Sequence, residues 1–352
     1  MYKRIFSWIL ILALVLSLTA CEKEAEAKGI PGWKADSPAM ASIVAFVEDV
    51  TNEKSPNYVP PEKRIVLFDS DGTLIGERYP TYSDQCLLLQ RLLHDDTAAN
   101  TPQEDLDFAK ALEAAIQSYE DLPSSPRSTA QMAAESFAGF TVEEYAAYVR
   151  AFMKQPVPGF SNMTYGERFF TPMVELVKYL DAHGFQVFIN SGTERTFLRV
   201  LIEDKLDSCI PPYRVIGSTF SLIATGQGDK APRDYTYAPE DQVLLEGNMV
   251  FKNLKMNKVV SIVDEIGAAP ILVFGNSSGD FAMGQYALQN GGRAYMLLCD
   301  DTVRDYGDTE EAAAFAERCA ALGFETVSMR DEFETIYREG VQMDAALQEK
   351  AG

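Results

Sequence analysis

Acidic, hydroxyl and amide side chains gather in three short segments of this sequence. Asp69 and Asp71 stand two positions apart, Ser191 lies in the second segment, and the third contains Asn276 and Asp280. Carboxylates can attack an electrophile, carry a proton or bind a hard cation, whereas hydroxyl groups donate hydrogen bonds to anions. If the three segments meet in space, they could form one catalytic site.

Each of these segments follows a short apolar run, and the runs span residues 65–68, 187–189 and 271–274. Unbroken apolar runs are typical of strands that are buried on both faces of a parallel sheet. In α/β proteins, ligands bind at the carboxyl ends of such strands. We therefore expect an α/β fold, with a Rossmann-like parallel sheet covered by helices on both faces and the three polar segments at one edge.

The remaining patterns divide the chain into parts. Residues 37–76 should form an N-terminal helix, with Ser37 as its N-cap, and the first part of the core. Residues 77–166 have a helical pattern that includes a capping-box signature at 141–144, so we expect an inserted helical cap. Residues 167–352 should complete the core, with a β-hairpin excursion near 218–250 and a helix over 258–266.

The ordered set of motifs resembles the haloacid dehalogenase superfamily. The segment Asp69-Ser70-Asp71-Gly72-Thr73-Leu74 is similar to the first motif of that superfamily, Ser191 to its second, Lys258 to its third and the segment 275–280 to its fourth. The match covers most of the chain after residue 20, and four motifs in order are more specific than a lone DxDGT. The resemblance implies a phosphatase that works through an aspartyl-phosphate.

The resemblance also implies a role for each site residue. Asp69 would be the nucleophile, and Asp71 would protonate the leaving alcohol and later activate water. Dehalogenases of the superfamily lack the second aspartate because a halide leaves without a proton, so phosphate chemistry is favoured. The residues expected to bind the phosphoryl group are Gly72, Ser191, Gly192 and Lys258, although Lys252 and Lys255 lie close to Lys258 in the sequence.

A magnesium ion is the cofactor that the resemblance implies, with Asp69, the carbonyl of Asp71, Asn276 and Asp280 as its expected ligands. Asn276 departs from the pattern because many members have an acidic residue there, which makes Asp280 the safer prediction. Glu77, Arg78 and Tyr79 follow the nucleophile loop and could contact the leaving group, or they could be hinge residues without ligand contact. The segment 59–64 before the first motif, together with the helical cap, looks most like exported phosphatases near the phosphoserine and phosphorylcholine phosphatases.

The N-terminal residues indicate export. A short positive region and an apolar run fill 1–20, and Leu18-Thr19-Ala20-Cys21 resembles a bacterial lipobox, which implies lipidation of Cys21 and an extracytoplasmic membrane anchor. An uncleaved anchor or an ordinary signal peptide is the alternative. Residues 21–36 should be a solvated tether. The net charge of -21 argues against nucleic acid as a partner.

The sequence therefore predicts hydrolysis of a small phosphomonoester, without naming it. A phosphotransferase of the same family and a non-catalytic lipoprotein that binds a phosphorylated ligand are the alternatives. The two histidines of the chain offer little material for a zinc site or a serine triad. Four further cysteines have no metal-like spacing, and we expect them to be buried hydrophobes; they are Cys86, Cys209, Cys299 and Cys319. The oligomeric state stays open.

Overall fold

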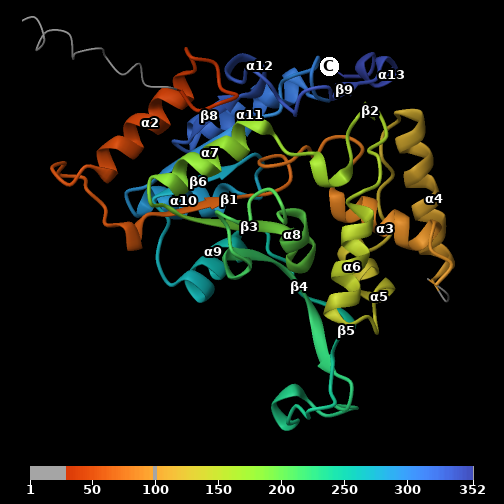
Figure 1. Ribbon diagram of the computed structural model, residues 1–352. Coiled ribbons are helices and arrows are strands. Elements are labelled where there is room, and N and C mark those ends of the chain that lie inside the picture. The colour runs from red at the N-terminus through yellow and green to blue at the C-terminus, as the bar shows by residue number, and fades with distance from the viewer. Residues whose placement is uncertain (1–28, 98–100, 352) are drawn as a thin grey trace, which may run out of the picture.

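The computed structural model of this protein describes residues 29–97 and 101–351 (Figure 1). The predicted signal segment, 1–20, and Cys21 lie outside the described residues, so export and lipidation stay predictions. Within the described ranges, no helix has both the length and the apolar character that are needed to cross a bilayer.

The helices and strands alternate along most of the chain. The α-helices are α2 (Pro38–Thr51), α3 (Ser83–Leu93), α4 (Gln103–Ser118), α5 (Thr129–Ser136), α6 (Val142–Phe152), α7 (Thr171–Ala182), α8 (Arg195–Leu201), α9 (Met256–Ser261), α10 (Phe281–Gln289), α11 (Thr309–Ala321), α12 (Met329–Glu332) and α13 (Ala345–Gln348). The strands are β1 (Ile65–Phe68), β2 (Phe160–Ser161), β3 (Gln186–Glu194), β4 (Val215–Ala224), β5 (Val243–Phe251), β6 (Leu272–Gly275), β7 (Arg293–Leu298), β8 (Glu325–Ser328) and β9 (Gln342–Met343).

A seven-stranded sheet forms the core, in the order β5-β4-β3-β1-β6-β7-β8. The strands pair in parallel except for β4 and β5, which are antiparallel. The predicted parallel α/β sheet is therefore confirmed. The three strands that precede the polar segments, β3, β1 and β6, are direct neighbours at its centre. Their carboxyl ends consequently lie side by side.

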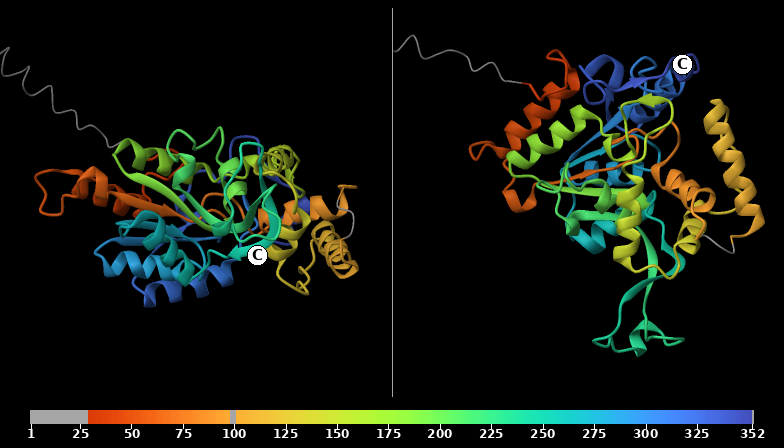
Figure 2. Two further views of the ribbon diagram at one scale, coloured as in Figure 1. Left: turned by 90° about the horizontal axis from the view of Figure 1, so that it is seen from below. Right: turned by 45° about the vertical axis from the view of Figure 1, so that its right-hand side comes forward.

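Alternating side chains of β1 face two separate helical layers. Val66 and Phe68 belong to the core that includes Ile43 of α2 and Leu176 of α7, whereas the opposite face packs against α10, α11 and the segment Ile262–Ile266. Figure 2 shows α2 and α7 on one side of the sheet and α10 and α11 on the other. Burying a large apolar side chain stabilises the fold by about 1.5–3 kcal/mol. Burial on both faces is what holds the strand ends in place.

The helical insertion and the β-hairpin are both present. The insertion carries α3, α4, α5 and α6, and Thr141 and Glu144 form the predicted capping box at the start of α6. β4 and β5 form the antiparallel arm that projects from the body in Figure 1. This arm also contacts the insertion, because the amide of Gly139 donates to Leu245 O at 2.8 Å and the amide of Leu245 donates to Phe140 O at 2.8 Å.

Two predicted segments differ from the structure. The described end of the expected tether, 29–36, packs on the core, since Ile30 and Trp33 are buried and Trp33 Nε1 donates to Pro172 O at 2.9 Å. Both side chains are too apolar to favour a solvated position. The predicted helix over 258–266 is an α-helical segment, α9, followed by a π-helical segment over Ile262–Ile266. Lys258 is therefore the third residue of α9 and not the first residue of a helix.

Candidate active site

A cavity of about 250 Å³ opens at the carboxyl ends of the three central strands. Asp69 directly follows β1, where its amide donates to Phe274 O of β6 at 3.0 Å. The cavity is lined by side chains from the sheet edge and from the insertion: Asp69, Asp71, Glu77, Tyr82, Asp84, Gln85, Thr129, Ser191, Gly192, Thr193, Lys252, Leu254 and Ser277. The structure thus brings the first and second predicted motifs together around one space.

Lys258 joins the first and fourth motifs beneath this cavity. Its Nζ lies 2.9 Å from Asp69 Oδ1 and 2.6 Å from Asp280 Oδ1, and only 1% of the side chain is exposed. Burial lowers the pKa of the Lys258 ammonium, but the charges of Asp280 and Asp69 prevail and raise that pKa above its ordinary value. The ammonium therefore stays charged beside Asp69, where a phosphoryl group would gain negative charge.

Asp71 is held by the second motif. Thr193 Oγ1 donates to Asp71 Oδ2 at 2.7 Å, and the amide of Ser83 lies 3.5 Å from Asp71 Oδ1. Asp71 lines the same cavity as Asp69. This is the position from which a carboxyl group could reach the leaving oxygen of a substrate attached at Asp69. Thr193 was missed in the sequence, although it belongs to the same polar segment as Ser191 and Gly192.

The predicted phosphate-binding residues occupy two different environments. Ser191 and Gly192 line the cavity, where a phosphoryl oxygen could accept their hydrogen bonds. Gly72 has φ +73°, and a Cβ there would lie 1.9 Å from Asn276 Nδ2 and 2.6 Å from Glu77 Cδ. Asn276 and Glu77 fill the space that a side chain at position 72 would need, so Gly72 permits their close approach, and its contact with phosphate stays a prediction.

Asp280, the safer of the predicted metal ligands, has both carboxylate oxygens in hydrogen bonds, and its metal ligation stays a prediction. Its Oδ1 accepts from Lys258 Nζ at 2.6 Å, and its Oδ2 accepts from the amides of Asn276 and Ser277, both at 3.0 Å. The side chain is fully buried. Asp280 is thus placed to hold Lys258 and the loop after β6, because both of its oxygens are already engaged.

The electrostatic balance of the site favours a bound cation. Burial and the charge of Asp280 raise the pKa of Asp69 to about 7, although Lys258 opposes that shift. Asp69 Oδ1 is buried, and among the described residues no aligned hydrogen-bond donor faces it, despite the nearby Lys258 Nζ. Residues 29–97 and 101–351 contain no convergent group of three His, Cys, Asp or Glu side chains that could hold a metal. The donors nevertheless suit Mg²⁺, which binds through one or two carboxylates and keeps several waters.

Of the three residues predicted to touch the leaving group, only Glu77 lines the cavity. Arg78 pairs with Glu311 at 2.5 Å and with Asp308 at 3.4 Å, at the start of α11. Tyr79 is buried, and its hydroxyl donates to Ile116 O at 2.7 Å. Arg78 and Tyr79 are thus engaged with other parts of the chain, and whether they contact the leaving group or act as hinge residues stays open between the two predictions.

The insertion supplies a wall of the cavity that the sequence did not identify. Tyr82, Asp84 and Gln85 come from the start of α3, and Thr129 comes from α5. Lys252 faces this wall, since its Nζ donates to Gly192 O at 2.8 Å and lies 3.9 Å from Asp84 Oδ2. These four insertion residues match no sequence motif. Their place in the cavity wall follows only from how the insertion folds over the sheet edge.

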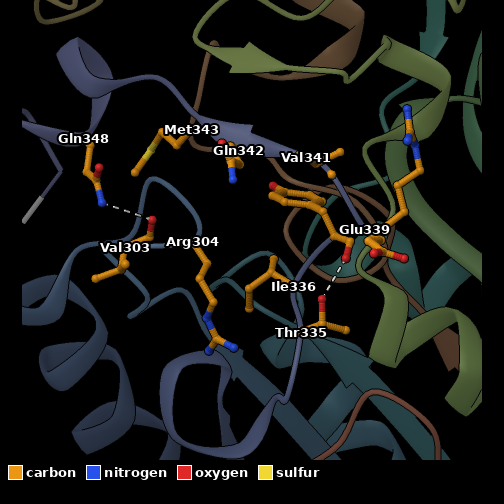
Figure 3. A pocket seen from close by; sticks show the side chains of 12 residues that line it. Val303, Arg304, Thr335, Ile336, Glu339, Val341, Gln342, Met343 and Gln348 are labelled. Carbon is orange, nitrogen blue, oxygen red and sulfur yellow. Dashed lines mark hydrogen bonds between the residues drawn. The ribbon is translucent and has the colours of Figure 1, made fainter.

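A second hollow, of about 410 Å³, lies near the C-terminus and is shown in Figure 3. None of the predicted site residues lines it. Its Arg304 donates to Asp301 Oδ2 at 2.6 Å and to Phe333 O at 2.9 Å, so the guanidinium is engaged in holding the C-terminal segment. We therefore place the candidate site in the cavity beside Asp69.

The sequence matches the model of one protein family, described as haloacid dehalogenase-like hydrolase, over residues 66–285. This segment begins in β1 and ends in α10, so it contains Asp69, Asp71, Ser191, Lys258 and Asp280. The comparison with curated proteins found no match.

Several solved structures are similar to this chain at low sequence identity. A conserved protein of unknown function from Anaerococcus prevotii is 14% identical with a TM-score of 0.48, and the alignment covers 82% of this chain and 92% of that one. A cytosolic 5'-nucleotidase IIIB bound to cytidine is 12% identical with a TM-score of 0.47, covering 90% and 92%. A phosphoserine phosphohydrolase-like protein from Francisella tularensis is 14% identical with a TM-score of 0.38, covering 76% and 95%. Likenesses this distant leave the chemistry to the family match and the site geometry.

Proposed function

The chain belongs to the haloacid dehalogenase-like hydrolase family, and from that premise we propose that it is a divalent-cation-dependent phosphatase of small phosphomonoesters. The observation that carries the proposal is the convergence of Asp69, Asp71, Ser191 and Lys258 at one cavity. A volume of about 250 Å³ suits a small substrate better than a polymer.

In the first half of the reaction, a carboxylate oxygen of Asp69 attacks phosphorus. The bond between phosphorus and the ester oxygen breaks, and Asp71 gives its proton to the departing alkoxide. Lys258, which lies 2.9 Å from Asp69 Oδ1, offsets the negative charge that accumulates there. Ser191 and Gly192 donate to the phosphoryl oxygens and fix the direction of attack.

In the second half, water attacks the phosphorus of the aspartyl-phosphate. Asp71 takes a proton from that water, the bond from phosphorus to Asp69 breaks, and inorganic phosphate leaves. Thr193 keeps Asp71 in place for both proton transfers through its 2.7 Å hydrogen bond. A bound Mg²⁺, held by Asp69 and the carbonyl of Asp71, would supply Lewis-acid neutralisation of the phosphoryl charge.

The test is phosphate release from an aryl phosphate, with and without EDTA. Wild-type protein should be active with Mg²⁺ and lose activity in EDTA. Asp69→Asn should lower kcat/KM by about a thousandfold or more, because it removes the nucleophile. Equal activity of the two proteins would show that Asp69 does not attack phosphorus. Adding alcohols and looking for transferred phosphate separates a hydrolase from a phosphotransferase.

A further inference from the structure

The loop after β6 offers no free carboxylate to the cavity within the described part of the chain. Position 276 is an asparagine, and both oxygens of Asp280 accept hydrogen bonds from Lys258 and from the loop itself. A hard cation beside Asp69 would therefore lack the second negative ligand that such a site commonly uses. If the site uses a second carboxylate, another part of the chain provides it.

Glu77 lies beside that loop and lines the same cavity. Its Oε1 accepts from Asn276 Nδ2 at 2.7 Å, so its carboxylate reaches the loop after β6. The Glu77 carboxylate also packs against the loop after β1. A Cβ added to Gly72 in that loop would lie only 2.6 Å from Glu77 Cδ. Glu77 and Asp69 line the same cavity. The carboxylate thus sits between the ends of the two strands that carry the first and fourth motifs.

Asn276 fixes this carboxylate in position. Thr73 Oγ1 donates to Asn276 Oδ1 at 3.1 Å, and this bond directs the opposite end of the amide, Nδ2, toward Glu77. An aspartate at position 276 could not donate that hydrogen bond and would repel Glu77. The asparagine and the glutamate are therefore matched to each other.

Asp69 offers a second observation about this site. The residue is only 8% exposed and lines the cavity. Its buried Oδ1 lies 2.9 Å from Lys258 Nζ, and among the described residues no other donor reaches that oxygen. The carboxylate is therefore held by one ammonium and faces a space in which a cation could bind beside it.

We propose that Glu77 is a direct carboxylate ligand of the divalent cation and replaces the acidic residue absent at position 276, with Asn276 as its positioning residue. The proposal rests on the cation dependence proposed above. It assigns to Glu77 a role different from contact with the leaving group. It also predicts that the carboxylate can be moved between positions 77 and 276.

The experiment measures binding of Mg²⁺ alone to the metal-free protein by titration calorimetry. Glu77→Gln keeps the length of the side chain and an oxygen for Asn276 but removes the charge. We expect its Kd for Mg²⁺ to rise by about tenfold or more, because changes even outside the direct ligands commonly cost about 10–100-fold. Asp84→Asn is the matched control, since Asp84 lines the same cavity. Its Kd should stay within about threefold of wild type.

The double variant Glu77→Gln, Asn276→Asp moves the carboxylate from position 77 to position 276, on the loop after β6. Its Kd should return to within about fivefold of wild type, because the number of charged ligands is restored. Far-UV circular dichroism in EDTA checks the fold of each variant. If Glu77→Gln does not fold, Glu77→Asp replaces it, because the shortened side chain withdraws the carboxylate and should also weaken Mg²⁺ binding.

A wild-type Kd for Mg²⁺ in folded Glu77→Gln overturns the proposal, as does the same result in Glu77→Asp if the first variant fails to fold. A change confined to KM for ammonium-bearing substrates, with Mg²⁺ binding intact, overturns it in favour of leaving-group contact. Because the titration contains no ester, this failure is distinct from failure of the proposed function. If the wild-type protein releases phosphate and Glu77→Gln binds Mg²⁺ with a wild-type Kd, the proposed function stands and only the role of Glu77 as a metal ligand is rejected.

Discussion

The two walls of the cavity are built differently. The sheet floor, which comprises Asp69, Ser191, Lys258 and Asp280, is buried and closely paired, with Lys258 in contact with both carboxylates. The cap wall, which comprises Tyr82, Asp84, Gln85 and Thr129, is more open, and 46% of Tyr82 is exposed. The floor carries groups that any phosphate ester would need. The wall carries groups that could distinguish one ester from another.

This difference concerns dielectric environment as much as position. Charges on the floor interact in a region without much water, where each interaction is strong and each unpaired group is costly. Charges on the wall face solvent, which weakens their interactions. We therefore expect substitutions on the floor to affect both stability and chemistry, and substitutions on the wall to affect mainly substrate binding.

The largest expected difference is in the stability that is lost when each of two lysines near the cavity is replaced. Lys258→Met should lower the free energy of unfolding by about 3–5 kcal/mol, because it leaves buried carboxylates without a counter-charge. Lys252→Met should cost less than about 1 kcal/mol, since the side chain of Lys252 is 39% exposed and its ion pair is long. Urea unfolding at pH 8 in EDTA measures both values. Equal losses would remove the distinction between floor and wall.

A smaller difference is expected between the kinetic effects of replacing two aspartates, Asp71 and Asp84. Asp71→Asn should lower kcat for an alkyl phosphate by about 10²–10⁴-fold, because the poor leaving group needs the proton of Asp71. The loss should be smaller for 4-nitrophenyl phosphate, whose leaving group needs less protonation. Asp84→Asn should instead change KM, with kcat altered by less than about tenfold. Steady-state kinetics on both esters tests this, and a similar kcat loss in the two variants would contradict it.

The smallest effect concerns pH in the metal-free protein. Burial and the charges of Asp71, Asp69 and Asp280 raise the pKa of Glu77 from 4.5 to about 8. Below pH 4.5 both the folded and the unfolded chain hold this proton. Between about 4.5 and 8 the unfolded chain releases it while the folded chain keeps it, so the stabilising contribution is lost as the pH rises.

Glu77→Gln should therefore flatten the fall of the unfolding free energy between pH 5 and 8. Urea unfolding in EDTA at several pH values gives this slope for both proteins. An unchanged slope in Glu77→Gln would mean that the glutamate ionises in the folded chain as freely as in water.

The sequence predicted the floor better than the wall, for a physical reason. Apolar runs that end in Asp69, Ser191 and Asn276 indicate buried parallel strands, and such strands align their carboxyl ends. The order of the strands, with β1 between β3 and β6, then brings the segments together. The roles of Asp280 and Glu77 could not be predicted in this way, because they depend on which side-chain oxygens are already engaged.

The cap wall lacked any such pattern. Tyr82, Asp84 and Gln85 have no motif, and their place in the cavity depends on how α3 packs against the rest of the insertion. The end of the predicted tether also depended on tertiary contacts, since Trp33 packs edge-on against Phe333, 300 positions away in the sequence, at a ring distance of 4.8 Å. Local pattern gives no information about a partner so remote.

The β4–β5 arm has a mechanical consequence for the insertion. β5 shares two backbone hydrogen bonds with residues 139 and 140, and Gln131 adds bonds to Gly247 O and to the amide of Met249. After β5 ends at Phe251, the chain continues through Lys252 to Lys258 in α9. A rigid movement of the insertion would have to break these hydrogen bonds or move the arm with it. Through the arm, the position of the insertion is therefore linked to the chain segment that carries Lys258.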